Sequence, residues 1–217
     1  MNVEVIVTTL TEAIQAEQLG AKRLELIADM ENGGITPSFG TIRNVVEHVS
    51  IPVHVMIRPH THSFHFNEDD VETMLADIGL CRELGVDGIV FGALTQDGAI
   101  DERILGEVIK HKGEMTLTFH RAFDASRDVF EAMDVLNEYP EVDILLTSGG
   151  AKTALEGIET LIALKEQAEM TILPGAGITV ETLPILQERL DVAMVHIGNG
   201  VRTNGQLDEG KFKQLLG

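Results

Sequence analysis

The sequence predicts a closed (β/α)8 TIM barrel, an α/β fold, on three observations. Short β-branched runs alternate with amphipathic stretches along the chain of 217 residues, and eight strand-like runs can be counted. A length slightly above 200 residues suits eight βα units in a closed barrel better than an open doubly wound sheet. No linker or low-complexity segment divides the chain, so we expect one domain over residues 1–217.

Each expected strand is a short run of β-branched and other apolar residues, and each expected helix repeats apolar residues three or four positions apart. The strands cover residues 3–7, 22–27, 51–57, 87–93, 115–120, 142–147, 171–177 and 192–198. The helices cover residues 11–21, 39–49, 69–85, 101–111, 127–139, 153–168 and 180–190. The last stretch, residues 208–217, is short for an eighth helix, so a short last helix and a missing one both remain open.

The composition of the chain limits the kinds of partner that we expect the protein to bind. The chain carries 16 basic and 35 acidic side chains, a formal net charge of −19 without histidine, and no basic run. Such a charge repels a phosphate backbone, so we expect no nucleic-acid partner. Apolar runs are strand-sized and the N-terminus lacks an export pattern, so we expect no membrane segment. A single cysteine, Cys81, fits a reducing, cytoplasmic location and falls on the apolar stripe of its helix, which predicts a buried core residue.

Along a barrel strand, alternate residues face the surrounding helices and the barrel axis, so a residue's position in the alternation predicts whether it packs against helices or can contact a ligand. In the run 51–57, Val53, Val55 and Ile57 form a face suited to the helices, which turns the alternate residues inward. Applied to the other strands, the same rule gives this inward polar set: Glu4, Glu25, His54, Arg58, Thr118, His120 and His196. Barrel sites lie at the C-terminal ends of the strands. The four members nearest those ends, Glu25, Arg58, His120 and His196, are therefore the candidate catalytic residues.

A structural alternative remains open for this polar set, because buried charges are costly unless paired. Glu25 would then pair with Arg58, and the histidines would bond to backbone carbonyls. For Glu4, at the bottom of its strand, the structural role is the favoured one.

The loops at the predicted mouth add candidates for ligand binding. After residue 120, Arg121 and Asp124 offer an anion-binding fork and a carboxylate, although Asp124 or Ser126 could instead cap the next helix. Three glycine-bearing turns follow the last three strands, with Gly149, Gly175, Gly177 and Gly198 as candidates. Barrels commonly hold phosphate at this position, and glycine also simply permits tight turns.

Three histidines, His60, His62 and His65, follow the third strand within six positions. Imidazoles at such spacing can ligate a borderline metal, so this loop is a candidate metal site. Loop histidines also occur without any metal, and no carboxylate is interleaved with these three.

The chain resembles the CutC family of copper homeostasis proteins. The resemblance rests on RLEL at 23–26, GGITPS at 33–38, IPVHVMIRP at 51–59, FGALTQDGAID at 91–101, TFHRAFD at 118–124, LLTSGGAKTALEG at 145–157, PGAGIT at 174–179 and His196. It implies a cytoplasmic, homo-oligomeric (β/α)8 barrel linked to copper tolerance, in which copper ion binding is proposed and no reaction is assigned. Carried over by motif, its site positions are Glu25, Arg58, His120, Arg121, Asp124, Thr147, Ser148 and His196.

The chain departs from the family pattern at Ile27, where members often have cysteine, and at His60–Ser63, where an Arg-Gly-Gly-Asp run is common. A small serine-bearing turn near the eighth strand is replaced by Ile197–Gly200. Because Cu(I) prefers thiolate and thioether ligands, a copper site in this chain would be histidine-based and more natural for Cu(II).

Two hypotheses follow. The first is a copper-handling protein, with copper as the bound ion. The second is an enzyme that performs acid–base chemistry on a small anionic metabolite, bearing phosphate or carboxylate, at the barrel mouth. The sequence leaves open whether the protein is an enzyme.

Overall fold

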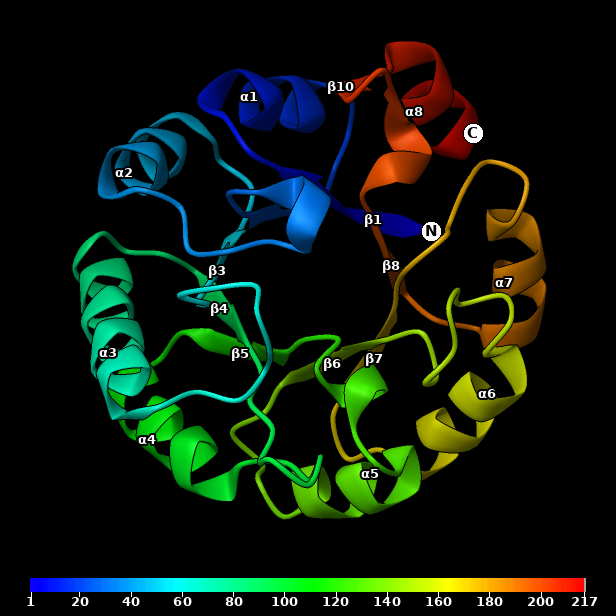
Figure 1. The fold of residues 1–217 in the computed structure, drawn as a ribbon. Helices are drawn as coiled ribbons and strands as arrows, with labels where there is room; N and C mark the ends of the chain where they lie inside the picture. The colour runs from blue at the N-terminus through cyan, green and yellow to red at the C-terminus, as the bar shows by residue number, and fades with distance from the viewer. Residues whose placement is uncertain (217) are drawn as a thin grey trace.

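Eight parallel strands form the wall of the expected barrel in a computed structural model that describes residues 1–216 (Figure 1). The strands are β1 (Asn2–Val7), β2 (Arg23–Leu26), β3 (Val53–Met56), β4 (Gly88–Phe91), β5 (Thr116–Phe119), β6 (Ile144–Thr147), β7 (Thr171–Pro174) and β8 (Met194–Ile197). They are ordered β7-β6-β5-β4-β3-β2-β1-β8. Within residues 1–216, β7 and β8 share no ladder of paired residues, so the barrel has a seam between these strands.

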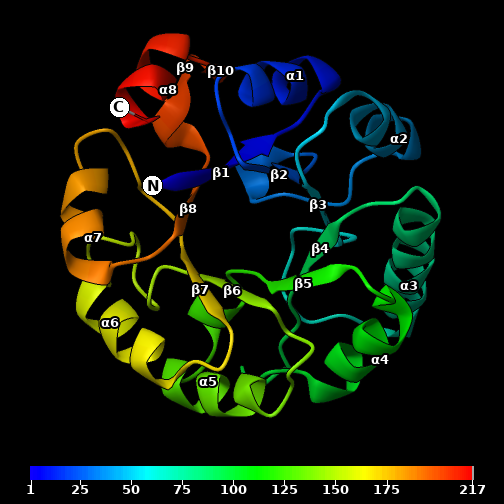
Figure 2. The same cartoon turned by 180° about the vertical axis from the view of Figure 1, so that it is seen from behind.

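Helices surround the strands on all sides, as both end views show (Figures 1 and 2). They are α1 (Leu10–Gln18), α2 (Phe39–His48), α3 (Glu68–Glu83), α4 (Glu102–Lys112), α5 (Val129–Asn137), α6 (Ile158–Gln167), α7 (Leu183–Leu190) and α8 (Glu209–Leu216). The eighth helix is therefore present and short. Across residues 1–216, no helix combines the length and apolarity that a bilayer crossing requires.

The predicted direction of the strand residues is confirmed. Val53, Val55 and Ile57 join the large apolar core that lies between strands and helices. The inward apolar residues form two separate clusters inside the barrel, one around Met56 and one around Leu146. This division leaves the interior only partly apolar, with polar side chains from several strands between the two clusters.

Helix α6 begins later than the sequence predicts, at Ile158 instead of residue 153. The segment before it forms turns, and the backbone of Gly157 lies so close to Ser148 that a Cβ at residue 157 would be 1.9 Å from the Ser148 carbonyl oxygen. This close approach fixes the loop after β6 against the start of α6, which periodicity alone could not reveal.

The segment after β8 is attached to the start of the chain by Arg202. This residue begins the short hairpin β9 (Arg202–Thr203) and β10 (Gln206–Leu207), and its side chain is 4% exposed. The guanidinium donates to the Glu12 carboxylate of α1, to the Ile6 carbonyl at 2.8 Å and to the Gly205 carbonyl at 2.8 Å. These contacts hold the hairpin against β1 and α1.

Replacing Arg202 is therefore expected to destabilise the fold. Removing one partner of a buried ion pair leaves the other charge without compensation, and Arg202→Met should cost about 3 kcal/mol in denaturant unfolding. Arg127→Met is the control, because Arg127 pairs with Asp97 and Glu131 on the surface and its loss should barely move the midpoint. Equal midpoint shifts for the two variants would contradict this account.

Candidate functional site

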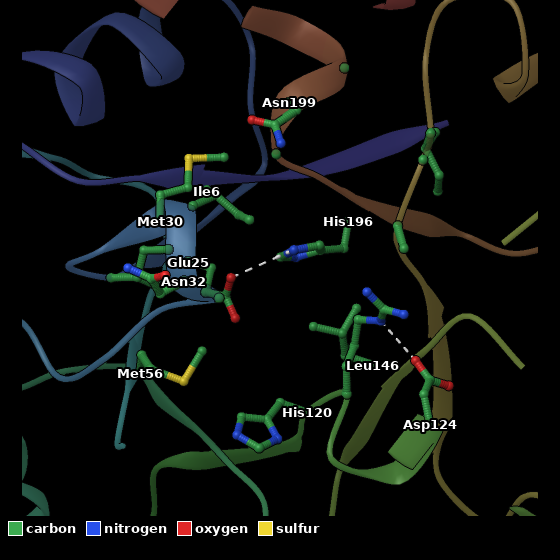
Figure 3. Close-up of a pocket in the computed structure, with 18 of the residues that line it drawn as sticks. Ile6, Glu25, Met30, Asn32, Met56, His120, Asp124, Leu146, His196 and Asn199 are labelled. Carbon is green, nitrogen blue, oxygen red and sulfur yellow. Dashed lines mark hydrogen bonds and ion pairs between the residues drawn. The ribbon is translucent and has the colours of Figure 1, made fainter. Parts of the chain in front are cut away.

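A cavity of about 740 Å³ opens at the C-terminal ends of the strands. Glu25, Arg58, His120 and His196, the four candidate catalytic residues, all line it. Figure 3 shows Glu25, His120 and His196 directed into the same space from different strands. Apolar side chains, including Ile27, Met56 and Leu146, form much of the remaining wall. The site is thus a partly apolar chamber with a few polar groups, as small-molecule sites usually are.

A row of three interacting side chains, Glu4, His196 and Glu25, crosses the barrel interior, and the last two also line this cavity. Glu4 on β1 accepts a 2.7 Å hydrogen bond from Nδ1 of His196 on β8 and also pairs with Arg23. On the other side of the ring, Nε2 of His196 lies 3.6 Å from Oε2 of Glu25 on β2. The register explains this arrangement, because β1 lies between β2 and β8 and places Glu4 opposite both Arg23 and His196.

The pKa values of the two carboxyl groups that flank His196 are shifted in opposite directions. Burial would raise the pKa of Glu4, but the hydrogen bond and charge of His196, with the charge of Arg23, lower it to about 2. Burial raises the pKa of Glu25 to about 7, even though the His196 charge opposes this shift. Burial also disfavours the His196 cation, yet the charge of Glu25 and the bond to Glu4 raise the His196 pKa. Glu25 can consequently take up and release a proton near neutral pH.

His120, just after β5, is held in one tautomer. The backbone N–H of Ala122 donates to its Nδ1 at 3.2 Å, which leaves the ring proton on Nε2. Burial and the nearby charge of Arg58 lower the His120 pKa to about 3, so the ring is neutral. No protein atom in residues 1–216 bonds its buried Nε2. His120, which lines the cavity, therefore has an N–H donor that no described protein atom uses.

Glycine at residue 92 makes room for this ring. A Cβ there would lie 2.4 Å from Nδ1 of His120, closer than any side chain tolerates. Deeper in the barrel, Gly88 makes the same space for His54, whose Nδ1 lies 3.4 Å from Thr118 Oγ1. Burial lowers the His54 pKa to about 4, so this ring is also neutral. His54 and Thr118 lie in the barrel interior and are not part of the cavity lining.

Arg58 follows β3 and does not pair with Glu25, so the predicted alternative of a Glu25–Arg58 ion pair is wrong. Its Nη1 donates weakly to the carbonyls of Gly33 and Gly34, at 3.4 and 3.3 Å, and its Cζ lies 4.5 Å from the centre of the Phe64 ring. Its buried Nε has no partner in residues 1–216. The guanidinium is thus placed by carbonyls and an aromatic face, with its charge unneutralised by any carboxylate in the described chain.

Arg121 and Asp124 line the outer cavity and pair with each other at 2.7 Å (Figure 3). Asp124 also accepts from the backbone N–H groups of Ser148 and Gly150, at 3.0 and 2.9 Å, and from the Thr147 and Ser148 hydroxyls. The alternative role of Asp124 or Ser126 as a helix cap is wrong, since Asp128 caps α5. Thr147 and Ser148 are fully buried and lie outside the cavity lining, so they orient Asp124.

The candidate glycines divide between the cavity and its supports. Gly177 and Gly198 line the cavity, on the loops after β7 and β8. Gly175 lies behind His196, where a Cβ would be 3.3 Å from its Cδ2 and 2.6 Å from Leu146 Cδ1. Gly149 has a φ of +73° and turns the chain next to Gly157, away from the cavity.

His60, His62 and His65 lie on the loop after β3 and not in the cavity lining. The rings of His60 and His62 stack with centres 5.1 Å apart, while Nδ1 of His65 lies 3.4 Å from the Leu94 carbonyl oxygen. Among residues 1–216, no three His, Cys, Asp or Glu side chains are grouped as a metal site would require. Cys81 is buried in the core as predicted, and burial raises its pKa to about 12.

Sequence reasoning missed Phe64 and Gly92 as parts of the site. Phe64 contacts Arg58 through its face, and its ring centre lies 5.2 Å from that of His120. It sits among the loop histidines, and these drew the interpretation toward metal binding. The signal for Gly92 was its inward parity at the end of a strand, next to a strand that ends in histidine.

The comparisons with known proteins agree with this fold. The model of the CutC family matches residues 1–201. The human copper homeostasis protein cutC homolog is 41% identical over 187 residues, which cover 85% of this chain and 68% of the human protein. A CutC family protein from Mesorhizobium japonicum is 38% identical over 196 residues, covering 89% and 76% of the two chains.

Solved structures give the same picture. The crystal structure of CutC from Streptococcus agalactiae superposes with a TM-score of 0.86 at 28% identity, covering 93% of this chain and all of that one. Phosphoribosyl anthranilate isomerase from Thermococcus kodakaraensis shares the barrel alone, with a TM-score of 0.67 at 16% identity and coverage of 99% and 96%. By sequence and by structure, this chain belongs to the CutC family.

Proposed function

We propose that the barrel mouth binds a small anionic organic molecule and transfers a proton on it. One observation carries the proposal: three buried side chains, Glu25, Arg58 and His120, line one cavity, and each has a polar atom without a protein partner in residues 1–216. Buried polar atoms are normally bonded, so three unbonded atoms on residues that line one cavity are what a ligand entering that cavity could satisfy. Perturbed acidities at Glu25 and His120 support the same interpretation.

The roles follow from the chemistry of each group. Arg58 carries a permanent charge against apolar walls and would bind carboxylate or phosphate. Glu25, with a pKa near neutrality, would exchange the proton. His196, held by Glu4, is a positioning residue that keeps Glu25 in place and adjusts its acidity.

Anion binding is tested by thermal unfolding in the presence of phosphorylated and carboxylated compounds. A ligand at 100 times its dissociation constant should stabilise the protein by about 2.7 kcal/mol. Arg58→Gln should abolish this stabilisation, whereas Arg103→Gln, which changes an exposed partner of Glu68, should retain it. If none of the phosphorylated or carboxylated compounds stabilises the wild type, the proposal is refuted.

The stability of the Glu25→Gln variant relative to wild type should depend on pH, because wild-type Glu25 is a buried acid with a raised pKa. The pKa of Glu25 is about 7 in the folded protein and 4.5 ordinarily, so the folded state binds the proton more tightly. Wild-type stability is then lost as pH rises from about 4.5 through about 7, by on the order of 3 kcal/mol. The glutamine variant carries no such loss, so its stability relative to wild type should increase between pH 5 and pH 8. If the difference in stability between the variant and wild type is the same at pH 5 and at pH 8, the raised pKa of Glu25 is contradicted.

Copper handling is the second candidate function. The family name and the human relative's name point to it, and one local observation favours the loop after β3: His60 and His62 stack, and Nδ1 of His60 is buried without a partner in the described residues. Two imidazoles suit Cu(II) better than Cu(I). Copper would then be cargo bound near the mouth.

A copper titration of purified protein tests this candidate. Replacing His60, His62 and His65 together by glutamine should weaken Cu(II) binding at least tenfold. The matched control replaces His48 and His111, surface residues whose Nδ1 atoms each bond a helix carbonyl. If both variants bind copper as the wild type does, the loop is not a copper site.

We also propose a cytoplasmic location and a homo-oligomeric state. The buried thiol of Cys81, the one cysteine in the sequence, is compatible with a reducing compartment.

An oligomeric interface has to place acidic surfaces apart, because each chain carries a formal charge of −19. Light scattering at high salt should give a mass above that of one chain, and a monomer would refute the oligomer.

A further inference from the structure

We infer, building on the anion site proposed above, that the substrate is an anionic carbonyl compound from which Glu25 removes a proton at the carbon next to the carbonyl, while Nε2–H of His120 binds the carbonyl oxygen. The substrate class covers 2-oxo acids and phosphorylated hydroxy ketones or aldehydes, which share a carbonyl, an adjacent C–H bond and a negative group.

His120 supplies the first argument. Its Nδ1 is occupied by the Ala122 N–H, so Nε2 is a donor, and an unpartnered donor on a residue that lines the cavity fits an acceptor on the ligand. A neutral imidazole N–H can polarise a carbonyl, because it donates a hydrogen bond to the oxygen on which negative charge develops in the enolate. Glycine at residue 92 leaves room for the ring in this position, since a Cβ there would lie 2.4 Å from its Nδ1.

The position of Arg58 gives the second argument. Both Arg58 and His120 lie against the same Phe64 ring, with Arg58 Cζ 4.5 Å and the His120 ring centre 5.2 Å from its centre. An anionic group at Arg58 and an oxygen at His120 can thus belong to one small molecule. The anion and the carbonyl are expected close together in the substrate.

Glu25 provides the base and completes the set. One of its oxygens faces His196, and the other, Oε1, is buried without a partner in residues 1–216. Glu25 comes from β2 and His120 from the end of β5, on different sides of the cavity (Figure 3). A planar group between them would have its C–H bond toward the carboxylate and its oxygen toward the imidazole.

The step balances without an added oxidant or reductant. The ionised Glu25 carboxylate takes the proton, the C–H electron pair becomes a C=C bond, and the carbonyl π pair moves onto oxygen. That oxygen gains negative charge and accepts the hydrogen bond from Nε2–H of His120. Return of the proton from Glu25 regenerates the carbonyl compound, and exchange of that proton with water leaves a measurable label.

Proton exchange into D2O, followed by proton NMR, tests the inference with defined probes. The panel contains pyruvate, 2-oxobutyrate, phenylpyruvate, dihydroxyacetone phosphate and ribulose 5-phosphate, so that its carboxylate and phosphate arms are distinguished. We expect at least one compound to lose its α-proton signal at least 100 times faster than in buffer. Glu25→Gln should abolish the exchange, and hydroxyacetone, which has no charge, should exchange only at the buffer rate.

Two substitutions at His120 separate its role from folding. His120→Gln retains an amide N–H and should keep part of the activity, whereas His120→Leu should lower the exchange rate by a factor of about 10²–10³. Thermal unfolding of both variants and ligand stabilisation check that the site is intact. Equal exchange rates in wild type and a folded His120→Leu variant would overturn the assignment of the donor.

The panel also distinguishes failure of this inference from failure of the proposed function. If a compound stabilises the protein in an Arg58-dependent way but no member of the panel exchanges its proton, the carbonyl chemistry is overturned and the anion site stands. If no compound stabilises the protein or exchanges, both are refuted.

Discussion

The candidate site depends on one constraint: two carboxylates are buried on either side of a single imidazole. Burial of a charge is expensive, and one His196 ring cannot compensate two carboxylates equally. Glu4 has the shorter contact and the added charge of Arg23, so it is the group that stays ionised. Glu25 has the longer contact and no such neighbour on its free oxygen, so burial raises its pKa toward neutrality.

Because His196 interacts more strongly with Glu4 than with Glu25, the two glutamates differ in protonation near neutral pH. Environments that separate the acidities of neighbouring groups are typical of acid–base sites. The same contrast holds for the imidazoles: His196 is biased toward its cation by two carboxylates, whereas His120, next to Arg58, stays neutral. The cavity is therefore lined by a carboxyl group with a raised pKa, Glu25, by the Arg58 guanidinium and by the neutral His120 ring, with apolar side chains between them.

The sequence predicted the scaffold and the inward set because both follow from a period of two along short strands. Parity was enough to place Glu25, His120 and His196 at one cavity, and position at a strand end was enough for Arg58. It could not predict partners, because these depend on register between strands: Glu4 next to His196 rather than Glu25 next to Arg58. The loops were less predictable still, since the role of Phe64 and the turn before α6 rest on contacts between segments distant in sequence.

Within residues 1–216, the seam between β7 and β8, where no ladder of paired residues forms, lies beside the cavity. His196 stands on one side of this seam and is tied by Glu4 to β1, away from the opening. Above it, the loops after β7 and β8 meet at Ile178 and Gly200, and these loops contribute Gly177 and Gly198 to the cavity lining. A molecule in the cavity that contacts both loops would add contacts across this seam. Binding of such a molecule would then oppose local unfolding of the two strands, and slowed amide exchange along them would report that a ligand is bound.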